Sequence, residues 1–371
     1  MQLAQAGRVP ACSTARDSVK TGMSYVHHLA RFVYLLSALI AFGASKARAN
    51  PLFEDNSLLA IELELPLSKI NASRRQKTPK QSNGLLRWTT AGGAKAEMVI
   101  KVRARGNFRR KSCTNPPLRL NFNKTDAENT LFSGQNKLKL VRPCTNSNRA
   151  TQWVVLEYLI YQSYQILTDE AFRVRPLSIT YTGDRNGKTP STQFGFVIED
   201  ERTLATRNGG NILQGARANK RALDPTTLAR LDLFQFMIGN NDFSAIRADR
   251  GQRCCHNIRL ITNDAGLGLR AAPYDFDFAG MVDADYATPP PNIRIRSVRT
   301  RYYRGFCQQP NETRRAVALF NAKRVALYDL YRNSAELSGP FEQKAIDYLD
   351  SFYEIINDPE QLNSKVVGRC R

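Results

Sequence analysis

NRATQWVVLEYLIYQSYQIL, residues 148–167, contains neither glycine nor proline and is rich in large apolar side chains. A run of this length and composition predicts a helix that is mostly buried. The residues before Asn148 show the alternation typical of strands, so the periodicity of the chain changes at this point. The fold class follows from the segments on either side of it.

The segments before the predicted helix favour short strands. In LLAIELELPL (58–67), apolar residues alternate with Glu62 and Glu64, as expected for a strand with one buried face. AEMVIKVRARGN (96–107), PLRLNF (117–122) and NKLKLV (136–141) continue the pattern, while residues 73–95 are predicted to be a loop. After the helix, FRVRPLSITYT (172–182) and TQFGFVIED (192–200) predict a strand pair joined by the turn GDRNGK.

The second half of the chain is predicted to be mainly helical. Asp224 and Pro225 are a good N-cap and first helical residue for TTLARLDLFQFMIGN, which should end near Gly239. HNIRLIT (256–262) and GLGLRAAPYDFDF (266–278) predict short strands, and residues 312–356 predict two helices separated at 338–340. We therefore expect an α+β protein with a β-rich region at 50–200 and a mainly helical region at 201–371.

The N-terminal residues resemble an export signal. Arg31 precedes an apolar run at 32–43, and Ala47-Arg48-Ala49 suits cleavage before Asn50. We interpret residues 1–49 as a signal peptide, with Met23 as a possible true start and an uncleaved anchor as the alternative. No further transmembrane span is expected. The predicted location is periplasmic or secreted.

Charge and cysteine content also suit an exported protein. Without residues 1–49 the chain has 48 Lys and Arg against 32 Asp and Glu, a net charge of +16. Such a charge suits small phosphates or an anionic envelope polymer, and no motif of a nucleic-acid module is present. IRIRSVRTRYYR (293–304) could bind an acidic substrate or be a solvated basic face.

Six cysteines remain without residues 1–49, an even number that suits disulfides. Cys113 with Cys144 is the first-choice pair among 15 connectivities.

APYDFDFAG (272–280) places Asp275 and Asp277 among aromatic residues with no neighbouring base. A buried carboxylate needs a cation, a proton or a nearby Arg or Lys. If the segment is extended, both acids point to the same side and could bind one divalent ion. The alternative is a turn whose acids pair with arginines.

GNNDFS (239–244) follows the predicted helix, and HN (256–257) and PYDFD (273–277) come next. A loop Asp, then an Asn, then an acidic motif is the order in which a kinase presents its base and its metal ligands. Together with RARGN (103–107) and GFVIED (195–200), these motifs resemble the CotH-like kinase family, named for spore-coat proteins, over roughly residues 57–360. That family has an atypical protein-kinase-like fold of two lobes and phosphorylates proteins on Ser or Thr. The resemblance implies ATP and Mg²⁺ or Mn²⁺ as cofactors.

The resemblance also implies roles for single residues. Asp242 would be the catalytic aspartate, Asn257 a metal ligand, and Asp275 a metal ligand assisted by Asp277. Here 15 residues separate Asp242 from Asn257, more than in the family pattern. This insertion is either a hairpin held by Cys254 or Cys255, or a sign of a degenerate kinase.

Glu157 is implied to pair with a strand lysine, for which Lys139 is the first choice and Lys137 or Lys101 the alternatives. Arg105, Gly106 and Glu199 are implied to contact the cofactor. Two other functions stay open: a non-catalytic kinase-like binding module with a basic surface, and another metal-dependent phosphate chemistry on the same carboxylates.

Overall fold

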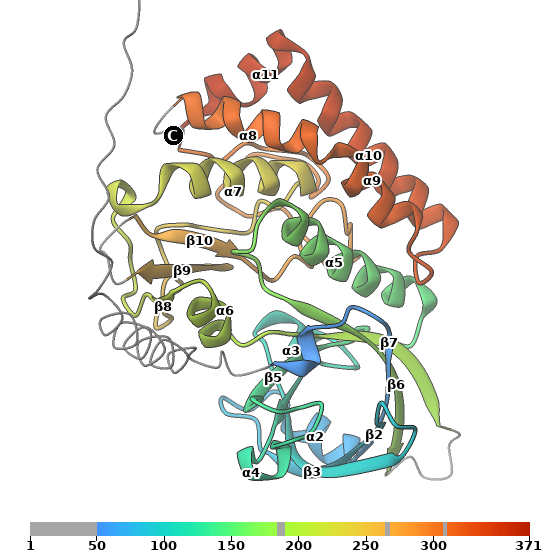
Figure 1. Cartoon of the computed structure of the whole chain (residues 1–371). Coiled ribbons are helices and arrows are strands. Elements are labelled where there is room, and N and C mark those ends of the chain that lie inside the picture. Colours follow the sequence, from blue (N-terminus) through green and yellow to red (C-terminus); the bar gives the residue numbers. More distant parts are fainter. Residues whose placement is uncertain (1–49, 184–189, 264–267, 307–309) are drawn as a thin grey trace, which may run out of the picture. The chain divides into compact units, whose positions relative to one another are not determined.

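The computed structural model describes residues 50–371 except 184–189, 264–267 and 307–309, and residues 48–371 form one compact unit. The predicted signal peptide, all of the predicted turn GDRNGK (183–188) except Gly183, and Cys307 lie outside the described residues. The protein is a mixed α+β structure in which a strand-rich N-terminal part with a seven-stranded closed barrel precedes a more helical C-terminal part (Figure 1).

The first part contains β1 (Leu59–Leu65), α2 (Leu67–Ser73), β2 (Ser82–Thr89), β3 (Lys95–Ala104), α3 (Phe108–Ser112), β4 (Leu118–Asn121), α4 (Lys124–Ala127), β5 (Lys137–Val141), α5 (Asn148–Leu167), β6 (Val174–Gly183) and β7 (Ser191–Ile198). The second part contains α6 (Glu201–Arg207), β8 (Gly210–Ile212), α7 (Pro225–Ile238), β9 (Ile258–Asn263), β10 (Arg270–Pro273), α8 (Pro310–Ala322), α9 (Arg324–Arg332), α10 (Gly339–Asn357) and α11 (Pro359–Lys365). Short 3-10 turns lie at Pro51–Phe53, Lys220–Ala222 and Val367–Arg369.

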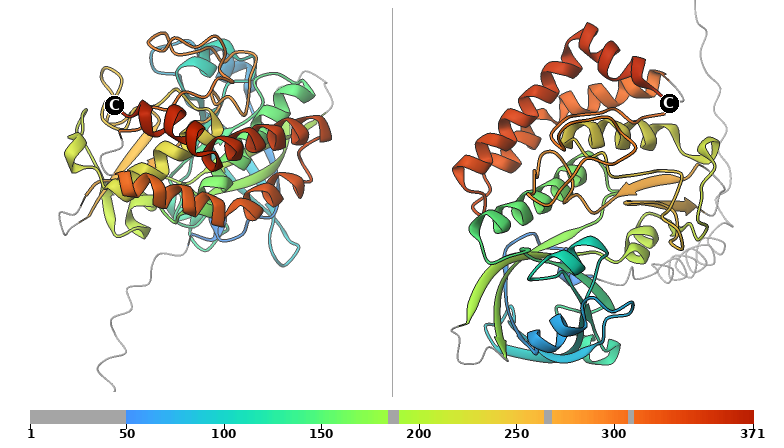
Figure 2. Two further views of the ribbon diagram at one scale, coloured as in Figure 1. Left: turned by 90° about the horizontal axis from the view of Figure 1, so that it is seen from above. Right: turned by 180° about the vertical axis from the view of Figure 1, so that it is seen from behind.

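The barrel closes in the order β1-β2-β3-β4-β5-β7-β6, and the right-hand view of Figure 2 shows it as a ring. β1 and β6 close it as a parallel pair, with Leu59 opposite Leu177 and Leu65 opposite Gly183. Gly183 has a φ of +104°, and a Cβ there would lie 2.5 Å from the carbonyl oxygen of Leu65. The close approach of the two strands therefore requires glycine at this position.

Side chains on each barrel strand alternate between the interior and the outer surface. On β3, Met98, Ile100 and Val102 are buried in the barrel core, whereas Lys101 and Arg103 are not. The same alternation on β4 and β5 gives these three neighbouring strands a polar outer face.

Helix α5 confirms the mostly buried helix predicted at 148–167, because 14 of its 20 residues are buried. The Ser147 side chain caps its first turn by accepting a hydrogen bond from the Ala150 amide. The helix packs against β6 and β7 of the barrel and against α9. It therefore links the barrel to the helical part.

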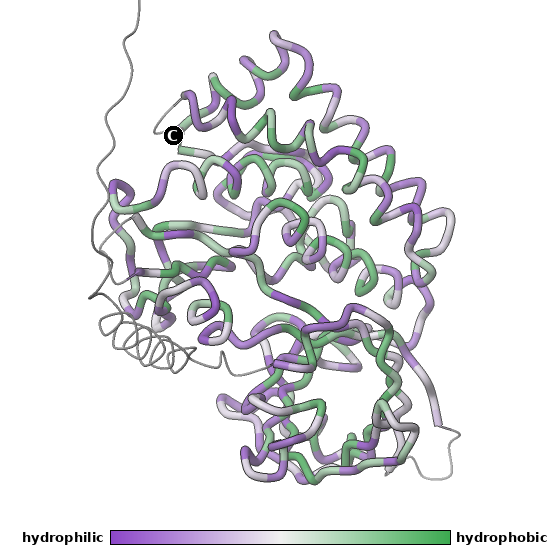
Figure 3. Tube along the Cα trace, viewed as in Figure 1, coloured by the Kyte–Doolittle hydropathy of each residue, from purple (hydrophilic) through white to green (hydrophobic). Residues whose placement is uncertain are grey.

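Helix α7 also begins and ends where the sequence predicts. The Asp224 side chain accepts a hydrogen bond of 2.7 Å from the Thr227 amide, and Gly239 ends the helix in the left-handed conformation. The outer helices α9 and α10 alternate between hydrophilic and hydrophobic residues in Figure 3, as expected for helices with one buried face. No described helix combines the length and apolar character needed to span a bilayer.

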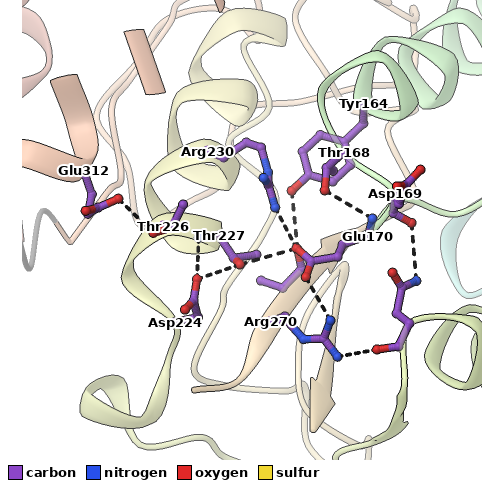
Figure 4. A network of polar contacts seen from close by, with 12 residues as sticks. Tyr164, Thr168, Asp169, Glu170, Asp224, Thr226, Thr227, Arg230, Arg270 and Glu312 are labelled. Carbon is purple, nitrogen blue, oxygen red and sulfur yellow. Dashed lines mark hydrogen bonds and ion pairs between the residues drawn. The ribbon is translucent and has the colours of Figure 1, made fainter. Parts of the chain in front are cut away.

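An ion-pair network fixes the end of α5 to its neighbours (Figure 4). Glu170 binds Arg230 of α7 at 2.6 Å and Arg270 of β10 at 3.1 Å. Arg270 also donates a hydrogen bond to the carbonyl oxygen of Asn208. The network holds α5, α7 and β10 together, and each of these elements carries or precedes a predicted site residue.

Three predictions about elements are wrong. The loop predicted at 73–95 contains β2, which buries Leu86 and Trp88. Residues 310–357 form three helices, because the chain is interrupted at Lys323 as well as before α10. The strand predicted to reach Phe278 ends at Pro273, and Asp275 has a φ of +64°, so the acid pair lies in a turn.

The Cys113–Cys144 disulfide predicted from the sequence is present. The neighbouring Cys254 and Cys255 also form a disulfide, and Cys370 is disulfide-bonded. The first bond ties the end of α3 to the segment between β5 and α5.

Candidate active site

A cleft of about 560 Å³ lies between the barrel and the helical part, a volume suited to a small ligand. Barrel residues line one side of it, from β3, α3, β4, β5 and the loops next to them. The other side comes from the loop after α7 and from the segments before β9 and after β10.

Arg109 of α3 lies among three carboxylates, Glu157, Asp275 and Asp277, which we call the acidic triad. Its guanidinium nitrogens lie 3.0 Å from Glu157 Oε2, 3.1 Å from Asp277 Oδ2 and 3.6 Å from Asp275 Oδ1. Arg109, Glu157 and Asp277 are buried, whereas Asp275 is about one-third exposed. An arginine therefore compensates part of the charge for which the sequence suggested a metal ion.

One guanidinium cannot balance three carboxylates. Burial raises the pKa of Asp277 to about 8 and also raises the pKa of Glu157, although Arg109 opposes both shifts. One carboxylate oxygen from each member of the acidic triad lies within 4.8 Å of the others. Oxygen donors at this spacing with excess negative charge fit a hard divalent cation, and Asp275 is the exposed member that could bind it.

Asp242 and Asn257 are in direct contact despite the 15 residues between them. Gly239 turns the chain out of α7, and the Asn240 side chain accepts a hydrogen bond from the Asp242 amide. Asn257 Nδ2 donates to the carbonyl oxygen of Asp242 at 2.7 Å and to its Oδ2 at 3.0 Å. The Asn257 Oδ1 makes no hydrogen bond to any described residue, so an amide oxygen is left for a cation.

His256 lies between two carboxylates. Its Nε2 is 2.8 Å from Asp242 Oδ1, and its Nδ1 is 2.9 Å from Asp249 Oδ2. The hydrogen bond to Asp242 and the two negative charges raise the pKa of His256 to about 9, against the effect of burial. At neutral pH the imidazolium therefore donates a hydrogen bond to each of the two carboxylates, Asp242 and Asp249.

Four cations on the barrel side of the cleft form a group that we call the cationic wall: Arg103, Arg105, Arg119 and Lys139. Among the described residues, no carboxylate lies within ion-pair distance of any of them. Arg105 Nη1 and Arg119 Nε are buried without a hydrogen-bond partner. Lys139 Nζ lies 4.7 Å from the centroid of the Tyr274 ring.

The structure brings most of the predicted site residues together, with two corrections. Glu157 binds Arg109 and not Lys139, because Lys139 projects from the outer face of β5 towards Tyr274. Glu199 does not line the cleft; it is buried, forms an ion pair of 2.9 Å with Arg207 and accepts a hydrogen bond from the Arg173 amide. Gly106, with a φ of +89°, does line the cleft.

The predicted basic stretch at 293–304 divides into two kinds of arginine. Arg294 and Arg296 are exposed. Arg301 donates hydrogen bonds to the carbonyl oxygens of Met237 and Tyr348, and Arg304 donates to that of Asn241. The half-buried Arg301 and Arg304 therefore hold the segment before Asp242, whereas Arg294 and Arg296 are exposed and available to a partner.

Sequence reasoning missed Arg109, Arg119, His256 and Asp249. Arg109 lies just after the motif RARGN (103–107), in the stretch RARGNFRRK (103–111), and nothing in that stretch distinguishes it from the arginines beside it. Arg119 cannot be recognised without the strand register, because only the pairing of β4 with β3 and β5 places it opposite Arg103 and Lys139.

No protein-family model matches the chain, and no curated protein matches it either.

Proposed function

We propose that this chain is a metal-dependent phosphotransferase of the CotH-like kinase type, with a two-lobe, kinase-like fold, that transfers the γ-phosphoryl group of ATP to a Ser or Thr hydroxyl of a protein. The supporting observation is that Asp242, Asn257 and Asp275 converge on one side of a cleft whose other side is the cationic wall. Oxygen ligands facing unpaired cations are what a metal-bound phosphate chain needs.

Each residue has a role in this proposal. Asp242 accepts the proton of the acceptor hydroxyl, while its contacts with His256 and Asn257 fix its orientation. The hydroxyl oxygen bonds to the γ-phosphorus as the bond to the bridging oxygen breaks and ADP leaves. Mg²⁺ or Mn²⁺, held by Asn257 and Asp275, would neutralise charge on the phosphates.

The other residues of the site hold the carboxylates in place or contact the phosphates, and the proposal also includes where the protein acts. Arg109 holds Asp277 and Glu157 in place, and the cationic wall, including Lys139 and Arg105, contacts the phosphates. Export to the periplasm or beyond is part of the proposal, and the Cys113–Cys144 disulfide supports it because such bonds persist in oxidising compartments.

A second candidate is a non-catalytic binding module that presents the same cleft to an anionic partner. The observation in its favour is Arg109, which already occupies part of the space among the triad carboxylates where a metal would bind. The two candidates differ in whether a divalent metal strengthens the binding of ATP through Asp275.

The test is calorimetric titration of ATP with Mg²⁺ or Mn²⁺ into oxidised protein, wild type beside Asp275→Asn. Asp126→Asn is the control, because Asp126 is an exposed acid on α4 of the barrel part. We expect metal-dependent binding that Asp275→Asn weakens about tenfold or more and Asp126→Asn leaves unchanged. Product analysis with γ-labelled ATP then separates transfer to protein from hydrolysis.

ATP binding that the metal does not strengthen, and that is equal in wild type and Asp275→Asn, would contradict the kinase proposal and favour the binding module.

A further inference from the structure

Three cations lie directly opposite one another on neighbouring barrel strands. The register pairs Arg103 of β3 with Arg119 of β4, and Arg119 in turn with Lys139 of β5. All three side chains lie on the outer face of the barrel and line the cleft. Arg105 extends the row, because its amide continues the β3–β4 pairing by donating to the carbonyl oxygen of Pro117 at 2.8 Å.

This arrangement is unfavourable without a ligand. Directly opposite residues on antiparallel strands have Cβ atoms only about 5 Å apart, and like charges there destabilise the sheet. Burial together with the charges of Arg105 and Arg103 lowers the pKa of Arg119. Burial and Arg105 lower the pKa of Lys139 to about 8.

Nearby acids relieve the repulsion only in part, because the pKa values of Arg119 and Lys139 stay lowered despite the charge of Glu201. Glu201, which faces this region, is already bound to Arg253 and Arg259. Neither Arg105 Nη1 nor Arg119 Nε has a hydrogen-bond partner among the described residues, although both atoms are buried. Both side chains line the cleft, and within the described part of the chain their guanidinium groups lack the anionic partner that a buried charge usually has.

From this row we infer a polyphosphate-binding site in which Arg103, Arg119 and Lys139, with Arg105, hold a chain of at least three phosphates. Three neighbouring strands span about 10 Å, which a single phosphate cannot bridge and a triphosphate chain can. The chemistry is shared by a nucleoside triphosphate and by inorganic polyphosphate. The inference rests on the proposed function and deepens it by assigning the phosphate contacts to a row of strand cations, of which the sequence suggested Lys139 and Arg105.

The direct test is titration of sodium tripolyphosphate into the full-length oxidised protein in EDTA, so that no divalent metal contributes. We expect wild type to bind and Arg119→Gln to lose about tenfold or more in affinity. Lys137→Gln is the matched control, because Lys137 lies on the same outer face of β5, one pair along from Lys139, but is exposed and outside the cleft. It should change the affinity less than about twofold.

Thermal melting shows whether a variant has failed to fold. Without ligand, Arg119→Gln should melt at a higher temperature than wild type, because it removes like-charge repulsion. With tripolyphosphate, wild type should gain more melting temperature than the variant. A folded Arg119→Gln that binds tripolyphosphate as tightly as wild type would overturn the inference.

ATP and orthophosphate complete the experiment. Tighter binding of ATP than of tripolyphosphate identifies a nucleoside triphosphate as the ligand, and equal binding identifies the bare chain; both support the site. Orthophosphate binding as tight as tripolyphosphate would contradict it. Because these titrations contain no metal, their outcome is independent of whether Asp275→Asn affects metal-dependent transfer, and each proposal can fail without the other.

Discussion

Asp232 is a single buried carboxylate that the proposed chemistry does not use. It lies on α7, and its Oδ2 accepts a hydrogen bond from the Phe306 amide, while its Oδ1 has no partner in the part of the chain that the structure describes. Burial raises the pKa of Asp232 from 3.8 to about 7. The folded protein therefore binds more protons than the unfolded chain between these values, and its stability falls as the pH rises through this window.

Replacing Asp232 with Asn should remove this loss of stability with rising pH. We expect Asp232→Asn to raise the free energy of unfolding at pH 8 by roughly 1–3 kcal/mol, and the gain should be smaller at pH 5. Urea denaturation at both pH values measures it, with Asp126→Asn as the exposed control. A gain of the same size at pH 5 and pH 8 would show that ionisation of Asp232 is not its cause.

At the residue scale, the sequence identified the acids of the site better than the bases. Asp242, Asn257 and Asp275 stand in loops next to apolar elements, where a polar residue is conspicuous. The arginines do not stand out in a chain with 54 Lys and Arg. Which of them is buried, as Arg109 is, depends on tertiary packing that local composition does not encode.

The turn at the end of α7 is the element that places Asp242. Gly239 has a φ of +64°, and a Cβ there would lie 2.0 Å from Tyr348 Oη. Tyr348 is itself held by a hydrogen bond to the carbonyl oxygen of Arg299 and by the stacked guanidinium of Arg301. Both the backbone conformation and the space therefore require glycine.

A residue other than glycine in the left-handed conformation costs about 1–2 kcal/mol. Gly239→Ala should lower the free energy of unfolding by more than this, because the steric clash with Tyr348 adds to the backbone strain. In a Tyr348→Phe background the cost should be smaller, since the hydroxyl is absent. A double-mutant cycle by urea denaturation measures this coupling. Equal costs in the two backgrounds would contradict the clash.

Helices and strands were predicted correctly where the local sequence signals are strong, and were missed where strand pairing determines the structure. The caps of α5 and α7 and the alternation in β3, β4 and β5 are local, and these elements were predicted. β2 was missed because basic and small residues flank a short alternation, and only pairing with β1 and β3 makes it a strand. The row of cations depends on the same strand register.

At the scale of the whole molecule, the Cys113–Cys144 disulfide joins segments 31 residues apart. Cys113 directly follows α3, which carries Arg109, and Cys144 lies between β5 and α5, which carry Lys139 and Glu157. The bond therefore fixes α3, which carries Arg109, to the segment that joins β5 to α5.

Replacing both cysteines with serine should lower the free energy of unfolding by roughly 3–4 kcal/mol, from the loop-closure entropy of a loop of this length. Urea denaturation of the double variant beside oxidised wild type measures the difference. Identical midpoints would show that packing alone holds α3, which would make the disulfide dispensable to the fold.

The disulfide also determines at which stage after synthesis α3 is covalently fixed at the cleft. A newly made chain in a reducing compartment has both thiols free, so α3 would be held at the cleft only by the ion pairs of Arg109 and by packing. In the proposed exported kinase, oxidation outside that compartment would complete the site. Full activity would then be delayed until the enzyme has left the compartment where ATP and unrelated proteins are abundant.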